Sequence, residues 1–69
     1  MVKLKVVYSN YFQNDLDAKL ARFVGKNIKN SSFLDTLRVL EFDFASEKAA
    51  NNYAKKLNGR TEIVEAVVE

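Results

Sequence analysis

Residues 2–9 alternate between two sides with a period of two, and this alternation constrains the fold more than any other feature of the chain. One side carries Val2, Leu4, Val6 and Tyr8, and the other carries Lys3, Lys5, Val7 and Ser9. Because successive side chains of a strand point to opposite faces, the segment is predicted to be a strand with one buried face. Helices are therefore expected to cover only one side of the sheet.

A helical period follows this strand. One apolar stripe is formed by Leu16, Leu20, Phe23, Val24 and Ile28. Asn14 suits the N-cap, and Asp15 and Asp17 lie in the first turn, where the helix dipole favours negative charge. Gly25 is predicted to mark the last turn or a close approach to the sheet, and residues 30–32 are predicted to end the element.

The second strand is predicted to run from Leu34 to Phe44. Its second half alternates cleanly, with acidic residues between apolar ones. Upstream the phase breaks, and a bulge near Arg38-Val39 would restore it. A hairpin within residues 31–44 is the alternative, although no glycine, proline or asparagine supplies a tight turn inside the run.

The last third of the chain predicts a second helix and a final strand. Ser46 is a candidate N-cap. It is followed by a narrow, alanine-rich stripe at helical spacing, formed by Ala49, Ala50, Tyr53, Ala54 and Leu57. Asn58-Gly59 is predicted to stop this helix, because glycine accepts the left-handed conformation that closes helices. Residues 63–68 are predicted to form the last strand, with both faces partly apolar.

The fold class predicted from these elements is α+β, as a single domain over residues 1–69. The order β-α-β-α-β would make a two-layer sandwich, a small sheet with both helices on one face, as a variant of the ferredoxin-like architecture. The uncovered face would show Lys3, Lys5, Val7, Val39, Glu41 and Asp43, joined by one of the pairs Ile63/Val67 or Val64/Ala66.

Composition excludes several classes of site. The chain of 69 residues has no cysteine and no histidine, which removes disulfides, thiolate nucleophiles, imidazole bases and the usual zinc ligands. Its two glycines cannot form a phosphate-cradling loop. We therefore expect no enzyme, no cofactor and no metal. Small secreted domains usually rely on disulfides, so a cytoplasmic protein is expected. No run reaches the roughly 18 apolar residues of a membrane span, and no signal-peptide block opens the chain.

Three surfaces are candidates for partner binding. The first 30 residues carry six basic and two acidic side chains, and the remaining 39 carry five and seven, so positive charge gathers in the first half. Helical spacing would align Lys19, Arg22, Lys26 and Lys29 along one side of the first helix. Tyr11 is a candidate exposed aromatic anchor. The third surface is the uncovered sheet face, with Lys3, Lys5, Glu41 and Asp43; the two carboxylates could hold a cation, but a solvated strand face is favoured.

The segment Leu4-Lys5-Val6-Val7-Tyr8, followed by Phe12, Gln13 and Asn14, resembles the start of a small antitoxin family of T-even-like phages, the discriminator of mRNA degradation. The β-α-β-α-β order is also similar over most of the chain. This resemblance implies a phage protein in the host cytoplasm that binds and blocks a host toxin, an mRNA endonuclease.

Ile63-Val64-Glu65 resembles the final strand of ferredoxin-like modules such as the small subunit of the purine-synthesis amidotransferase complex. That likeness implies a β-α-β-β-α-β order and requires residues 31–44 to split into two strands. Both resemblances imply a protein-binding role. The leading expectation is thus a non-catalytic regulator or inhibitor of a host protein. The alternatives are a module that binds RNA or single-stranded nucleic acid, and a homodimeric subunit of an enzyme complex.

Overall fold

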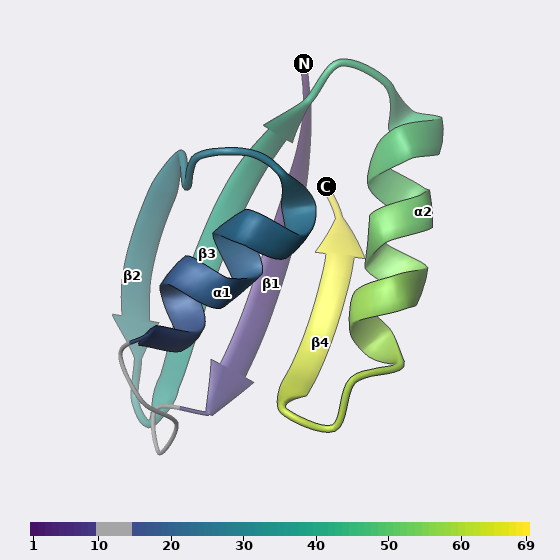
Figure 1. The fold of residues 1–69 in the computed structure, drawn as a ribbon. Coiled ribbons are helices and arrows are strands. Elements are labelled where there is room, and N and C mark those ends of the chain that lie inside the picture. Colours follow the sequence, from purple (N-terminus) through teal and green to yellow (C-terminus); the bar gives the residue numbers. More distant parts are fainter. Residues whose placement is uncertain (10–14) are drawn as a thin grey trace.

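The computed structural model describes residues 1–9 and 15–69, and it contains four strands and two helices within them (Figure 1). In chain order these elements are β1 (Val2–Ser9), α1 (Asp15–Val24), β2 (Asn30–Leu34), β3 (Leu37–Phe44), α2 (Glu47–Asn58) and β4 (Ile63–Val68). The predicted bounds of the first and last strands are confirmed.

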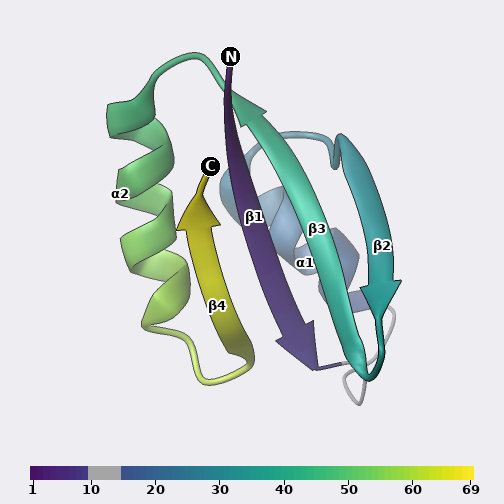
Figure 2. The same ribbon diagram turned by 180° about the vertical axis from the view of Figure 1, so that it is seen from behind.

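The strands form one sheet in the order β2-β3-β1-β4, and every neighbouring pair is antiparallel. The α+β class predicted from the sequence is confirmed. The observed chain order is β-α-β-β-α-β, which is the split β-α-β arrangement. Figure 2 views the sheet from the side opposite to α1, where the strands lie in front of that helix.

The predicted β-α-β-α-β order is wrong, because residues 30–44 form a hairpin and not a single strand. Asp35 and Thr36 connect β2 to β3, with Leu34 paired to Leu37 on either side of them. Asp35 has a φ of +56°, a left-handed conformation that aspartate tolerates better than most residues. The turn therefore needs no glycine or asparagine, and it accounts for the broken phase that had suggested a bulge near Arg38.

A register shift occurs instead where β1 pairs with β4, between Val7 and Tyr8. Ile63 lies opposite Tyr8 on the buried side, whereas Val67 lies opposite Lys5 on the uncovered side. The expectation that one of the pairs Ile63/Val67 or Val64/Ala66 lies together on the uncovered face is therefore wrong. Ile63 and Ala66 are both buried, because the irregularity changes the alternation along β4.

Helix α1 is shorter than its apolar stripe suggested. It ends at Val24, and Gly25 follows with a φ of +75°. The amides of Gly25 and Lys26 both donate to the carbonyl of Ala21, at 2.9 and 3.2 Å, and so satisfy a carbonyl of the last turn. Gly25 thus follows the last turn, which is one of the two roles expected for it. The expectation that residues 30–32 end this element is wrong, because those residues begin β2 and Ile28 lies beyond the helix. The expected N-cap, Asn14, is outside the described residues.

Helix α2 begins as predicted, because the Ser46 side chain accepts a hydrogen bond of 3.2 Å from the Ala49 amide. It ends at Asn58, also as predicted. Gly59, however, has a φ of −80°, so the left-handed conformation expected there is wrong. Backbone amides of the following turn donate hydrogen bonds to the last carbonyls of α2. One example is the bond of 3.0 Å from the Arg60 amide to the Leu57 carbonyl.

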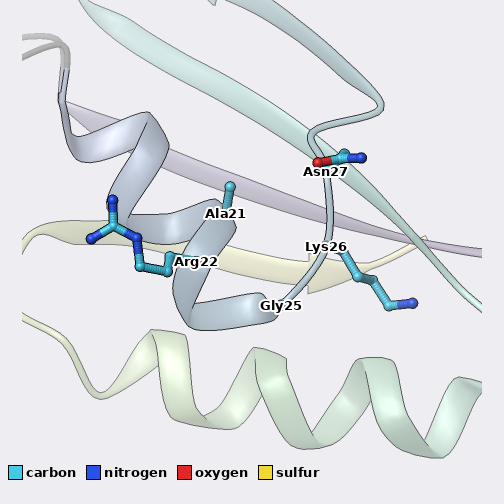
Figure 3. A pocket seen from close by; sticks show the side chains of 5 residues that line it. All are labelled: Ala21, Arg22, Gly25, Lys26 and Asn27. Atoms are coloured by element: carbon cyan, nitrogen blue, oxygen red, sulfur yellow. The ribbon is translucent and has the colours of Figure 1, made fainter.

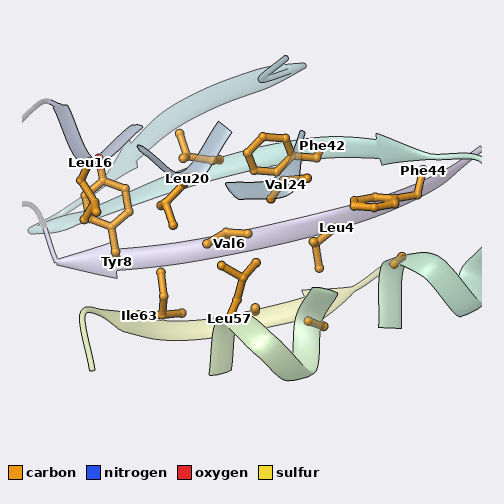
Figure 4. Close-up of a cluster of buried hydrophobic side chains, with 14 residues drawn as sticks. Leu4, Val6, Tyr8, Leu16, Leu20, Val24, Phe42, Phe44, Leu57 and Ile63 are labelled. Carbon is orange, nitrogen blue, oxygen red and sulfur yellow. The ribbon is translucent and has the colours of Figure 1, made fainter. Parts of the chain in front are cut away.

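One hydrophobic core joins both helices to the same side of the sheet (Figure 4). Its largest fully buried side chains are Phe42, Phe44, Leu4, Leu20, Leu40, Leu57 and Val6. The strand members of this set occupy alternate positions, so they share a face. Complete burial of one such side chain contributes about 1.5–3 kcal/mol to folding. The predicted placement of both helices on one side is confirmed by this shared core.

A polar anchor fastens α1 to the sheet. The Tyr8 hydroxyl donates a short hydrogen bond to the Asp17 carboxylate, and Arg38 donates to the other oxygen of that carboxylate from Nη2 at 2.9 Å and from Nε at 3.2 Å. Burial, reinforced by the bond to Asp17, raises the pKa of Tyr8 to about 12. The carboxylate also raises the pKa of Arg38. The beginning of α1 is thereby tied to both β1 and β3.

Within the described ranges, neither helix has the length and apolar character needed to cross a membrane.

Candidate functional site

The uncovered sheet face brings together the four charged residues predicted for it. Lys3 lies opposite Asp43, and Lys5 lies opposite Glu41, on the central strands β1 and β3. Opposite charges facing one another across strands stabilise a sheet by a fraction of a kcal/mol. The pairing also cancels the charge of this surface, so the face has little attraction for a polyanion.

The same face lacks a platform for stacking nucleobases. Four-stranded RNA-binding modules stack bases on aromatic side chains of the exposed sheet surface. Here the aromatic residues of the central strands, Tyr8, Phe42 and Phe44, are buried and pack into the core. Nor do three metal-ligating side chains gather anywhere in residues 1–9 and 15–69.

The basic stripe predicted along α1 is only partly present. Lys19 and Arg22 lie on the helix, but Lys26 and Lys29 follow Gly25 and lie on the connection to β2. The expected alignment of all four residues along one helix is therefore wrong, because the helix stops at Val24. Tyr11, the predicted aromatic anchor, lies outside the described residues.

A different arrangement of cations and rings lies where the end of α1 meets α2, and we call it the basic–aromatic cluster. Its members are Phe23, Phe44, Tyr53, Lys26, Lys56 and Arg60. Tyr53 is central to it. Its ring centre lies 6.0 Å from that of Phe23, in an edge-to-face arrangement, and 5.6 Å from that of Phe44. Such ring pairs contribute about 0.5–1.5 kcal/mol beyond their buried area.

Two lysines lie over rings of the cluster. The Lys26 Nζ is 5.1 Å from the centre of the Phe44 ring, and the Lys56 Nζ is 5.1 Å from that of Tyr53. Phe44 is buried, whereas Tyr53 is half-buried and both lysines are exposed. The cations therefore keep their outer sides in solvent while each covers the face of a ring.

Arg60 completes the cluster from the loop after α2. Its guanidinium carbon lies 5.2 Å from the centre of the Phe23 ring, which is 38% exposed. Arg60 also forms a short ion pair with Glu62, and this bond lowers the pKa of the Glu62 carboxyl. Arg60 is thus neutralised locally, and the positive charge of the surface comes from the lysines and from nearby Arg22.

An open depression adjoins the cluster at the end of α1. It is lined by Ala21, Arg22, Gly25, Lys26 and Asn27 (Figure 3). The side chains of Arg22 and Lys26 extend away from one another in this view. Their charged groups do not converge on one point, as they would around a small bound anion. The surface suits an extended occupant that touches several separated cations.

The cluster was only half visible in the sequence. Arg22 and Lys26 were predicted as basic contacts, but Phe23 was assigned to the core stripe and Tyr53 to the alanine-rich stripe. The spacing of Tyr53 and Lys56 by three residues on one helix was the signal that could have linked them. The contacts of Phe23 and Arg60 join segments more than 30 positions apart, which no local period reveals.

Comparison of the chain with protein-family models, with curated proteins and with solved structures found no match.

Proposed function

We propose that this chain is a non-catalytic protein-binding module that holds an acidic segment of a partner protein against the basic–aromatic cluster. The observation that supports it is the combination of exposed cations with rings that reach the surface. Lys26 and Lys56 offer charge, and Phe23 and Tyr53 offer partly exposed apolar area beside it. Partly exposed aromatic side chains such as these are enriched at protein interfaces.

The ring contacts favour a polypeptide over single-stranded nucleic acid. A base that stacks on Tyr53 or Phe23 would compete with Lys56 or Arg60, which already lie over those rings. Carboxylates need no ring face, since they can approach the outer sides of the lysines. An apolar side chain of the partner would then cover the exposed part of Phe23.

Binding of this kind acts by occlusion, since the module covers a surface of its partner without contributing chemistry. A regulator or inhibitor fits this mode, and a phage antitoxin that blocks a host toxin in the cytoplasm would be one instance. Electrostatic attraction to the acidic segment would mainly raise the association rate, and contact with Phe23 and Tyr53 would slow dissociation.

Synthetic peptides test the proposal directly. We expect a peptide rich in aspartate and glutamate with one leucine or phenylalanine to bind and to shift the amide resonances of Phe23, Lys26, Tyr53 and Lys56. Its affinity should fall with added salt. Lys56→Glu should weaken binding about tenfold, whereas Lys55→Glu, a matched charge reversal on the same helix, should have little effect.

Two results would contradict the proposal. Equal weakening by Lys56→Glu and Lys55→Glu would show that only net charge matters. Saturable binding of single-stranded RNA at 150 mM salt, with no binding of the acidic peptides, would instead favour a nucleic-acid-binding module.

A further inference from the structure

The outer edge of β2 is open. This strand is at one end of the sheet order, and all five of its residues are exposed. Phe33 and Leu34 are 63% and 61% exposed, large values for apolar side chains. An edge strand presents unpaired backbone groups, which are a template for another strand.

The opposite edge, at β4, is closed. The Ala66 amide donates to the Asn58 Oδ1 at 2.8 Å, and the Asn58 Nδ2 donates to the Ala66 carbonyl at 2.9 Å. The side-chain amide of Asn58 thus takes the place that a peptide group of a neighbouring strand would occupy. Helix α2 also lies alongside β4 in both views (Figures 1 and 2). Within residues 1–9 and 15–69, such a bond from another element to the outer backbone is seen at β4 and not at β2.

The residues of β2 lack the features that usually protect an edge. Lysine, proline and inward-pointing charges are common protective devices, and none of them occurs in the segment Asn30-Ser31-Ser32-Phe33-Leu34. Charged residues instead flank the strand. Lys29 precedes it, held beside β3 by a bond of 2.8 Å from its amide to the Glu41 carbonyl, and Asp35 follows it in the turn.

We propose that β2 pairs antiparallel with β2 of a second copy of this chain, about a two-fold axis at Ser32. Ser32 would then face itself, and Ser31 would face Phe33. In this register Lys29 of each copy lies opposite Asp35 of the other, which gives two identical opposite-charge pairs at the ends of the junction. Moving the axis by one residue in either direction places Lys29 opposite an apolar residue. Charge complementarity therefore selects this register.

The resulting dimer joins two four-stranded sheets into one continuous sheet. The two Phe33 side chains would be diagonal neighbours, about 7–8 Å apart, on the helix-covered side. Each ring is already held by Arg38, whose guanidinium carbon lies 4.4 Å from its centre. A junction of two five-residue strands falls below the roughly 1,000 Å² of buried surface expected of a stable interface. The dimer is therefore weak and forms with rising concentration.

Single cysteines test the register, since the chain has none of its own. Directly opposite residues of an antiparallel pair have Cα atoms about 4.5–5.5 Å apart, within the range that a disulfide spans. Ser32→Cys should therefore form a covalent dimer readily under mild oxidation. Ser31→Cys should react at least about tenfold more slowly, because the two residues 31 would be diagonal and not opposite. Equal rates for the two variants would overturn the proposed axis.

Sedimentation over a range of concentrations tests the charge pairing. Lys29→Glu should raise the dimer dissociation constant about tenfold, because it sets two like-charged pairs at the junction. Adding Asp35→Asn to that variant should recover part of the loss. Lys48→Glu, an exposed charge reversal on α2, should dimerise like the unmodified chain. A chain that stays monomeric to millimolar concentration would refute the dimer and leave the edge for a strand of another protein. None of these outcomes depends on binding at the basic–aromatic cluster.

Discussion

The two edges of the sheet differ in how their backbone groups are satisfied. At β4, the side chain of Asn58 bonds both the amide and the carbonyl of Ala66, and α2 lies alongside. At β2, the five exposed residues have only β3 as a neighbour in the sheet. A single asparagine at the end of a helix thus satisfies both backbone groups of one residue at the edge of the sheet.

The difference shows that closure of an edge is a local property, set by what the adjacent element can reach. Helix α2 lies alongside β4, and residues 59–62 turn the chain back so that its last residue, Asn58, reaches Ala66. Helix α1 ends at Val24, and residues 25–29 form a connection of similar length to β2. No corresponding side chain of α1 bonds the outer backbone of β2 in the described part of the chain.

The largest loss of stability is expected from Arg38→Ala, because this substitution removes the side-chain contacts that support β2 at the open edge. Arg38 stacks on Phe33, donates to the Ser32 carbonyl at 3.4 Å and pairs with Asp17. The Asp17 carboxylate would lose its charged partner while partly buried. We expect the free energy of unfolding to fall by about 2.5 kcal/mol, measured by urea denaturation. Arg60→Ala, which removes a more exposed ion pair, should cost less than 1 kcal/mol. Similar losses for both variants would contradict this ranking.

Asn58→Ala should open the closed edge. Loss of two hydrogen bonds to Ala66 should lower the free energy of unfolding by about 1.5 kcal/mol. Hydrogen exchange at the Ala66 amide should accelerate more than exchange at the other amides of β4. Asn51→Ala, an exposed asparagine of the same helix, provides the control. Unchanged protection of Ala66 would show that α2 itself closes the edge without the side-chain bonds.

A smaller effect is expected from the turn that presents β2. Asp35→Ala should destabilise the fold by about 1 kcal/mol, because alanine lacks the side chain that supports a left-handed φ. Asp35→Asn should stay within about 0.5 kcal/mol of the original chain, since asparagine tolerates the same conformation. Thermal unfolding of the two variants measures the difference, and equal losses would mean that the backbone conformation is not the cause.

The ionisation of Tyr8 is expected to have the smallest effect on stability at neutral pH. Because its pKa is raised from 10.0 to about 12, the folded chain holds this proton longer than the unfolded chain does. The protonated Tyr8 hydroxyl therefore contributes fully to the free energy of unfolding below pH 10. This contribution is lost as the pH rises from 10 to 12. Absorbance at alkaline pH should show one tyrosine that ionises late, and Tyr8→Phe should abolish that late step. Persistence of the late step in the variant would assign it to another tyrosine.

The spacing of apolar residues and the capping residues predicted those helices and strands that depend on interactions between neighbours in the sequence. The alternation from Val2 to Ser9 matches β1, and Ser46 caps α2 as its side chain suggested. Both signals depend on neighbours within a few residues, and so one sequence is enough to read them. Gly25 was recognised as a special position, but the helix was predicted to continue past it to residues 30–32.

The hairpin was missed because its turn uses a weaker signal. Aspartate adopts the left-handed conformation less readily than glycine or asparagine, so Asp35 did not outweigh the apolar run around it. Because the hairpin was missed, part of the candidate site was also predicted in the wrong place. With β2 unrecognised, neither the open edge nor the role of Arg38 could be predicted, and Lys26 was assigned to a helix that ends before it. The basic–aromatic cluster depends on contacts between distant segments.

The position of Tyr53 gives the protein a built-in optical reporter. The chain contains three tyrosines and no tryptophan, so tyrosine emission is not masked. Tyr53 touches Phe23 and Phe44 and has Lys56 over its ring, and it is half-buried at the surface. An occupant that draws Lys56 away or covers Phe23 must change the surroundings of that chromophore. The unlabelled chain should therefore signal binding at this surface through its own fluorescence.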